Sequence, residues 1–319
     1  MSLSLDRGAL TLSLDFELVW GSRDLLDPEA LSRQAAVTRA QVFPALLGML
    51  SRHGMQATWA TVGHLFLERA EPGLHQRLSP PTHSWMRRPW LEGVPPGPEA
   101  EAPTFYGRSL VQRLLEAGQE VGSHGFTHAI FGDEGCSAEV ARSELSSSVR
   151  AAAELGVGLR SFVFPRNRIG HRELLVEHGF GCYRGLDASW HSDPEAFRPL
   201  ARLAHLAEVA RGKQAPTVLP FRDEHGLWCI PGSASFLPID GVRRLIPVRQ
   251  RVKRATRCLE AASRDRRIAH LWLHPINLAS NPPLLLGMME RVLDHAARLR
   301  DQGRLEVLSM GQVLDRCQA

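Results

Sequence analysis

Residues 119–128 read QEVGSHGFTH, a short apolar run that leads into His124 and His128. If this stretch opens a helix at the end of a strand, the two histidines lie one turn apart on the same face and can share one cation. The spacing alone does not decide the matter, because the chain has 14 histidines and such pairs also occur on ordinary helix surfaces. Two other segments favour the metal site.

The first of these segments lies near the start of the chain. Residues 9–14, ALTLSL, read as a buried strand that runs directly into Asp15, Phe16 and Glu17. Strand alternation places Asp15 and Glu17 on the same side. Two carboxylates at the end of an apolar strand repel each other and lose hydration, so we expect them to share a cation or a proton. The alternative is a strand that has simply ended.

The second segment, HLWLHP at residues 270–275, is again an apolar strand with a polar residue at its end. Pro275 stops the strand directly after His274. A histidine near a metal is a suitable general acid, because its unperturbed pKa lies near neutrality. We interpret His270, four residues earlier, as a strand residue without a catalytic role.

In this order the three segments resemble those of the NodB-type polysaccharide deacetylases, also called carbohydrate esterase family four. ATWATVG at residues 57–63 is similar to the family's second strand, and FPRN at residues 164–167 to its third motif. The chain departs from the common pattern twice. Phe16 separates the two acids of the first motif, which indicates an acid-x-acid branch of the family, and Arg166 follows Pro165 where many members place Arg before Pro.

The resemblance implies an α/β fold, a distorted (β/α) barrel of about seven parallel strands. It implies one divalent metal ion held by Glu17, His124 and His128. On ligand type we expect Zn²⁺, with Co²⁺, Ni²⁺, Mn²⁺ or Fe²⁺ as alternatives. Asp15 would be the general base and His274 the general acid.

The remaining candidate site residues come from the third motif and from DASW at residues 187–190. By resemblance, Arg166 would hold Asp15 ionised and Asp187 would orient His274. The alternative for Arg166 is a structural ion pair. Asn167 and Trp190 are the candidate substrate-binding residues.

The length and composition fit one large domain over residues 1–319. The chain is 44% hydrophobic and 23% charged, enough to bury a large core. Strand and helix patterns alternate, which predicts parallel strands with helices outside. Long insertions at about 71–104 and 191–240 interrupt the pattern. Trp85 and Trp90 in the first insertion either roof a sugar site or pack under their own loop.

No apolar run is long enough to cross a bilayer, and the first residues do not resemble a signal peptide, so we expect a cytoplasmic protein. The five cysteines are odd in number and lack CxxC spacing, which indicates free thiols. Arginines cluster over residues 243–267, where they either contact phosphate or an anionic membrane surface or form a solvated helix face. We expect no nucleic acid partner, because the stretch has no interleaved aromatic residues.

Together these observations predict a metal-dependent hydrolase that removes an N-acetyl or other N-acyl group from an amino sugar. The lack of an export signal favours an intracellular nucleotide- or lipid-linked sugar of bacterial polysaccharide or glycoconjugate synthesis. Two alternatives stay open. One is the same metal site acting on a non-sugar amide or formamide, and the other is a non-catalytic sugar-binding member of the fold.

Overall fold

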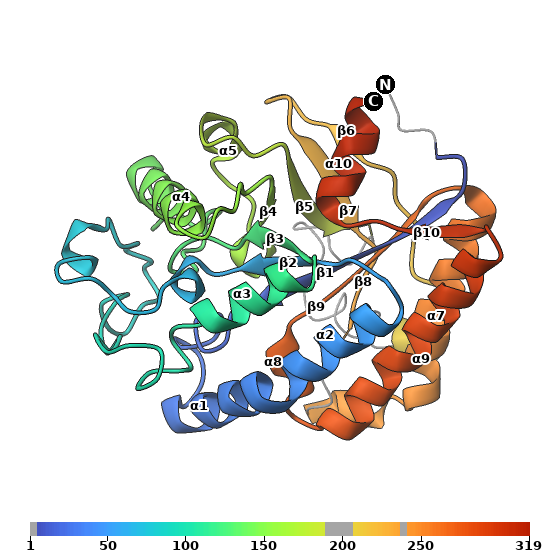
Figure 1. Cartoon of the computed structure of the whole chain (residues 1–319), viewed down its shortest axis with the longest axis horizontal. Coiled ribbons are helices and arrows are strands. Elements are labelled where there is room, and N and C mark those ends of the chain that lie inside the picture. Colours follow the sequence, from blue (N-terminus) through green and yellow to red (C-terminus); the bar gives the residue numbers. More distant parts are fainter. Residues whose placement is uncertain (1–4, 189–206, 237–240) are drawn as a thin grey trace.

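The computed structural model describes residues 5–188, 207–236 and 241–319, in which strands and helices alternate (Figure 1). The strands are β1 (Gly8–Phe16), β2 (Thr58–Thr61), β3 (Glu120–Ser123), β4 (Ser161–Val163), β5 (Cys182–Asp187), β6 (Phe221–Arg222), β7 (Trp228–Gly232), β8 (Ala234–Ser235), β9 (Ile268–Leu273) and β10 (Leu305–Val307). The helices are α1 (Pro28–Val37), α2 (Phe43–Arg52), α3 (Arg108–Glu116), α4 (Ala138–Ala153), α5 (Arg172–Glu177), α7 (Val248–Asp265), α8 (Pro275–Leu278), α9 (Pro282–Asp301) and α10 (Met310–Gln318).

The central strand of the sheet is β1, which is buried along its whole length. It pairs in parallel with β2 on one side and β9 on the other, and the order continues from β2 through β3 and β4 to β5. Strands buried on both faces read as nearly continuous apolar runs, which is why residues 9–14 could be recognised. The parallel pairing also brings the carboxyl ends of β1, β3 and β9 to the same edge.

The segment that carries β7 and β8 closes the sheet. β7 pairs in parallel with β5, and β8, separated from it by Ser233 alone, pairs in parallel with β9. The ring therefore consists of β1, β2, β3, β4, β5, the β7–β8 segment and β9. This confirms the expected distorted (β/α) barrel of about seven parallel strands.

The location of the closing strand differs from the expectation, since residues 191–240 were expected to form a long loop. Pro231 argues against a strand in the sequence, because proline has no backbone N–H to donate to a neighbouring strand. It is tolerated here because the pairing register of β5 shifts between Gly185 and Asp187, opposite Pro231 and Gly232. Of the predicted substrate-binding residues, Trp190 lies outside the described residues.

The helices pack outside the ring, with α1, α2, α7 and α9 along one side of it in Figure 1. Two arginines of α7 are less exposed to solvent than the sequence indicated. Arg251 and Arg254 are buried, and they donate to the backbone carbonyls of Arg243 and Lys213. These two arginines are therefore not part of the surface, whereas Arg249 and Arg257 of the same helix are exposed, so contact with phosphate or a membrane and a solvated face both stay predictions. Within the described ranges, no helix combines the length and the apolar character needed to span a membrane.

Two fully buried histidines make stability depend on pH. Burial lowers the pKa of His64 and of His270 to about 3, and the charge of Arg184 adds to the effect on His270. Below about pH 6.5 the two histidines bind protons in the unfolded chain, whereas in the folded protein they stay neutral. Their contribution to stability is therefore complete above pH 6.5 and is lost as the pH falls towards 3, by about 1.4 kcal/mol per pH unit for each histidine.

We expect this loss to be measurable by urea unfolding of the metal-free protein at pH 6.5 and pH 5. A His64→Gln variant should lose about 2 kcal/mol less than wild type between these two pH values. Equal losses in both proteins would show that His64 is protonated in the folded state.

Candidate metal and catalytic site

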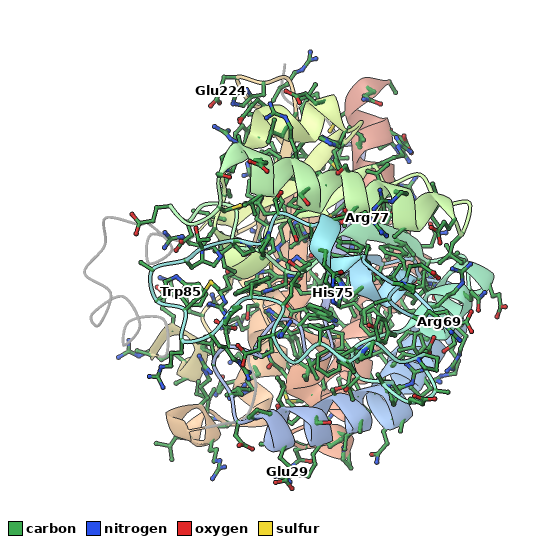
Figure 2. All side chains as sticks on the ribbon, turned by 90° about the vertical axis from the view of Figure 1, so that its left-hand side faces the viewer. Glu29, Arg69, His75, Arg77, Trp85 and Glu224 are labelled. Atoms are coloured by element: carbon green, nitrogen blue, oxygen red, sulfur yellow. The ribbon has the colours of Figure 1, made fainter. Side chains whose placement is uncertain are left out.

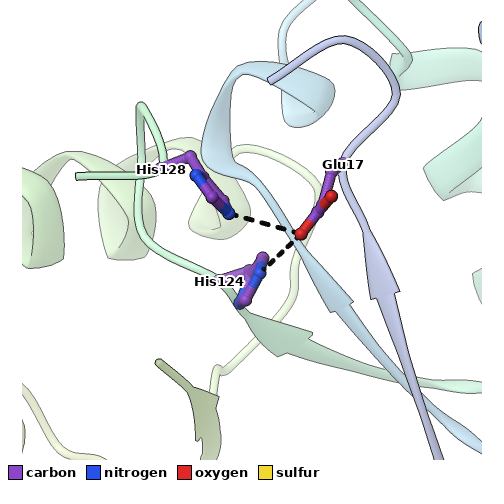
Figure 3. A group of neighbouring side chains, drawn as sticks. All are labelled: Glu17, His124 and His128. Carbon is purple, nitrogen blue, oxygen red and sulfur yellow. Dashed lines mark hydrogen bonds and ion pairs between the residues drawn. The ribbon is translucent and has the colours of Figure 1, made fainter. Parts of the chain in front are cut away.

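The predicted metal ligands meet at the carboxyl edge of the ring (Figure 3). Oε1 of Glu17, just after β1, lies 3.0 Å from Nε2 of His124 and 3.3 Å from Nε2 of His128. All three side chains are at least 96% buried, because none is more than 4% exposed. The structure thus brings together the three residues that the sequence singled out.

The tautomer of His124 indicates that this group requires a cation. Nδ1 of His124 lies 2.7 Å from the carbonyl oxygen of Val163, so Nδ1 carries a proton and donates it. In the neutral ring Nε2 is then a lone-pair acceptor, yet it faces the carboxylate of Glu17. Two acceptors at this distance repel each other unless a proton or a metal ion lies between them.

The protein without metal resolves the conflict by protonation. Burial acts to lower the pKa of His124, but the hydrogen bond to Glu17 and the charges of Asp15 and Glu17 outweigh it and raise that pKa. Burial likewise acts to raise the pKa of Glu17, but His274, His124 and His128 hold it well below its usual range. Either a proton or a divalent cation therefore stabilises this group.

His128 supplies the observation that favours a metal. Both of its ring nitrogens are buried without a hydrogen bond, although Nε2 faces Glu17. Burial lowers the pKa of His128, so this ring stays neutral. A neutral imidazole with an unsatisfied Nε2 beside a carboxylate is a typical metal ligand, and two histidines with one carboxylate form a recognised zinc donor set. The residues present therefore fit the expected divalent ion.

The histidine loop, residues 124–129, is not the helix start that the sequence suggested. Gly125 and His128 have φ values of 74° and 65°, in the left-handed region, so no helical turn forms here. The two imidazoles converge instead because the chain folds tightly around a buried carboxylate. Glu144 of α4 accepts hydrogen bonds from the backbone N–H groups of Phe126 and Thr127 and from the Thr127 hydroxyl.

We expect Glu144→Ala to loosen this loop and to weaken metal binding, by about 10- to 100-fold as for other groups that orient metal ligands. The variant leaves several buried N–H groups unsatisfied. Metal affinity measured by competition with a chelator checks this, with Glu139→Ala on the same helix as control. An unchanged affinity would show that the loop holds its shape without Glu144.

An unpredicted arginine holds Asp15. Arg184 of β5 donates to both carboxylate oxygens of Asp15, at 2.5 and 2.7 Å, and both side chains are buried. The same guanidinium donates to Ser13 and to the side-chain oxygen of Asn167. Burial acts to raise the pKa of Asp15, but the charges of Arg184 and His274 outweigh it and lower that pKa. Asp15 is therefore ionised at neutral pH.

This arrangement corrects the expectation for Arg166. Its guanidinium binds both oxygens of Asp24, at 2.5 and 2.6 Å, and lies 5.2 Å from the ring centre of Trp85. Arg166 and Asn167 both have positive φ values, 54° and 52°, because the turn after β4 bends sharply here. The turn directs Asn167 to Arg184 and Arg166 to the neighbouring Asp24. The side-chain oxygen of Asn167 therefore accepts from Arg184, and a role of Asn167 in substrate binding stays a prediction.

The candidate acid lies beside the metal-binding group. Nε2 of His274 is 3.5 Å from Oδ2 of Asp15 and 3.5 Å from Oε1 of Glu17, and its side chain is 28% exposed. Asp187 accepts a hydrogen bond from Nε1 of Trp272 at 2.7 Å, and the Trp272 ring packs edge-on to His274. Asp187 is thus linked to His274 through Trp272, and its role in orienting His274 stays a prediction.

Sequence reasoning missed Arg184 and Glu144. Arg184 is the third of the six residues of β5 and pairs with Val163, the last residue of β4, so a rule that looks for polar residues at a strand end does not mark it. Glu144 lies in the middle of a helix, and no local pattern distinguishes it from an ordinary surface glutamate.

Comparisons with known proteins give a family model for part of the chain and solved structures with the same fold. Residues 35–180 match the family model described as polysaccharide deacetylase. The match includes both histidines of the loop, whereas Asp15, Glu17 and Arg184 lie outside it. No curated protein sequence matches the chain.

Three solved structures share the fold over nearly the whole chain. A Mycobacterium smegmatis protein assigned to the polysaccharide deacetylases is 16% identical, with a TM-score of 0.62, and the alignment covers 99% of this chain and 94% of that one. A Pseudomonas aeruginosa PAO1 protein with the same assignment is 12% identical, with a TM-score of 0.63 and coverage of 97% and 90%. The PuuE allantoinase is 11% identical, with a TM-score of 0.61 and coverage of 97% and 89%.

Proposed function

We propose that this chain, a NodB-like barrel whose residues 35–180 match the polysaccharide deacetylase family model, is a metal-dependent hydrolase that removes an N-acyl group from an amino sugar. The observation that carries the proposal is the convergence of Glu17, His124 and the unsatisfied Nε2 of His128. These three residues would hold the divalent cation, for which we propose Zn²⁺. When bound, it would polarise the acyl carbonyl and lower the pKa of a nearby water molecule.

Two residues of this chain move protons. The carboxylate of Asp15, kept ionised and fixed by Arg184, takes a proton from the attacking water. His274 lies on the same side, 3.5 Å from Asp15 Oδ2, and gives a proton to the sugar nitrogen as the C–N bond breaks. Water thus supplies the hydroxyl of the released acid, and the amine leaves neutral.

We expect His274→Ala to slow turnover by about 10²- to 10⁴-fold, the usual range for a general acid. The metal content should not change, because the three proposed ligands remain. Steady-state kinetics together with elemental analysis check this. Wild-type turnover in the variant would exclude His274 as the acid.

A second candidate function has one observation in its favour. An allantoinase has the same fold with a TM-score close to those of the two deacetylase-type neighbours, so the barrel itself does not require a sugar substrate. A metal-dependent amidase or deformylase acting on a non-sugar amide would use the same residues.

The two functions separate in a panel of N-acetyl sugars, nucleotide-linked N-acetyl sugars and simple N-acyl amides, assayed for released acid with the metal-loaded protein. Release from sugars alone is the expected result. Release from simple amides alone would assign the second function. Sugar binding without release from any compound would favour a non-catalytic sugar-binding protein.

A further inference from the structure

A cavity of about 290 Å³ lies beside the histidine loop. Its walls come from residues 23–28 and 85–90, and we call it the arginine cavity. Figure 2 faces this side of the molecule, with Trp85 above the start of α1, where Glu29 lies. Trp90 in its wall donates a hydrogen bond to the carbonyl of Thr127, the neighbour of His128. The cavity therefore borders the histidine loop.

The walls of the cavity are cationic. Arg23, Arg87 and Arg88 line it, and Asp24 is the acidic residue among them. Arg166 binds both carboxylate oxygens of Asp24, so one acid is shared among Arg166 and the three arginines of the wall, and positive charge remains in surplus. Arg87 is exposed and makes no ion pair within the described part of the chain. A cavity with this surplus of guanidinium groups attracts an anion, and arginine forks suit phosphate oxygens.

The burial of Arg23 is the second observation that indicates an anion. Its side chain is only 9% exposed and lies over the Trp20 ring at 5.0 Å. Nη2 donates to the carbonyl of Glu92 at 2.6 Å, but Nη1 is buried without a partner. Burial and the charge of Arg88 lower the pKa of Arg23 to about 10. An unsatisfied buried guanidinium is costly, and an anion in the cavity reduces this cost.

The rim of the cavity is apolar. Leu25 and Leu26 are 64% and 46% exposed, and Trp85 is 39% exposed. Large side chains of this kind beside arginines suit a ligand with a phosphate next to an apolar or planar group.

We propose that the arginine cavity binds the phosphate of an amino sugar that carries a phosphate ester on its anomeric carbon. This inference rests on the proposed function. In a 2-acylamino sugar the anomeric carbon is bonded to the carbon that carries the N-acyl group. The phosphate must therefore lie close to the reacting carbonyl, as the cavity lies close to the histidine loop. A nucleoside diphosphate and a lipid phosphate both supply this group.

The test is calorimetric binding of glucose 1-phosphate and of glucose to the metal-loaded protein. Neither ligand has an acyl group, so binding does not depend on turnover. We expect glucose 1-phosphate to bind at least about tenfold more tightly than glucose. The double variant Arg87→Gln, Arg88→Gln should lose this preference, whereas the exposed control Arg33→Gln should keep it. UDP-glucose and farnesyl phosphate, titrated in the same way, distinguish a nucleotide from a lipid source.

Equal affinities for the two glucose ligands, or a phosphate preference that survives in the double variant, would overturn the proposal. So would binding of glucose 1-phosphate together with failure of both larger esters, since the cavity would then hold no substrate phosphate. Acyl release is a separate measurement. If no N-acyl sugar is hydrolysed while the arginine-dependent phosphate preference is present, the proposed function fails and the anion site stands.

Discussion

Replacement of Asp15 by asparagine should abolish most of the acyl release and leave the metal in place. We expect turnover to fall by about 10²- to 10⁴-fold, because an amide cannot take the proton of the attacking water. Asparagine has nearly the same shape and keeps an oxygen towards Arg184. The proposed metal ligands are untouched, so the metal content should equal that of wild type.

The measurement is single-turnover kinetics on a hydrolysed N-acyl sugar, with elemental analysis of the same preparation. Asp223→Asn is the matched control, because Asp223 is also bound by an arginine, Arg172, but lies outside both the proposed catalytic group and the arginine cavity. Loss of metal from Asp15→Asn would mean that Asp15 is a ligand and that the base lies elsewhere.

The second large effect should come from Arg184 and not from Arg166. Arg184→Gln leaves the buried carboxylate of Asp15 without its counter-charge, so we expect a loss of about 3–5 kcal/mol in the free energy of unfolding. Arg166→Gln removes a more exposed pair with Asp24 and should cost no more than about 1 kcal/mol.

Arg184 also sets the ionisation of Asp15. Arg184 lowers the pKa of Asp15, so its removal should move the acidic limb of the pH–activity profile to higher pH. A purely structural role would lower activity at every pH without moving this limb. Urea unfolding and the pH dependence of turnover in the two variants therefore separate the two roles. An unmoved acidic limb in Arg184→Gln would show that Arg184 does not tune the base.

The strands near the catalytic edge were predictable because a parallel strand that is buried on both faces is apolar along nearly its whole length. The buried strand expected at residues 9–14 lies within β1, and the apolar strand expected to stop before Pro275 is β9, which ends at Leu273. The candidate catalytic and metal-binding residues Asp15, Glu17 and His274 could be selected because they follow these apolar runs. A polar residue that follows an apolar run at the carboxyl end of a parallel strand faces the common edge of the barrel.

The rest could not be predicted, because it depends on contacts between distant segments. The histidine loop takes its shape from Glu144, and its sequence alone favoured a helix. Which arginine binds Asp15 depends on the turn at Arg166 and Asn167. Both residues of this turn have a left-handed backbone conformation, and the turn directs Arg166 to Asp24 and leaves Asp15 to Arg184. The closing strand was hidden because Pro231 fits only opposite the register shift in β5.

The central claim, a metal held by Glu17 for deacylation, is tested most directly by the metal content of the purified protein. Wild type, Glu17→Ala and the exposed control Glu29→Ala should be compared by elemental analysis, with acyl release from N-acyl sugars measured in parallel. We predict nearly one equivalent of divalent metal and acyl release in wild type and control, and loss of both in Glu17→Ala. Wild-type protein that binds no divalent metal, or Glu17→Ala protein that keeps its metal, would contradict the account.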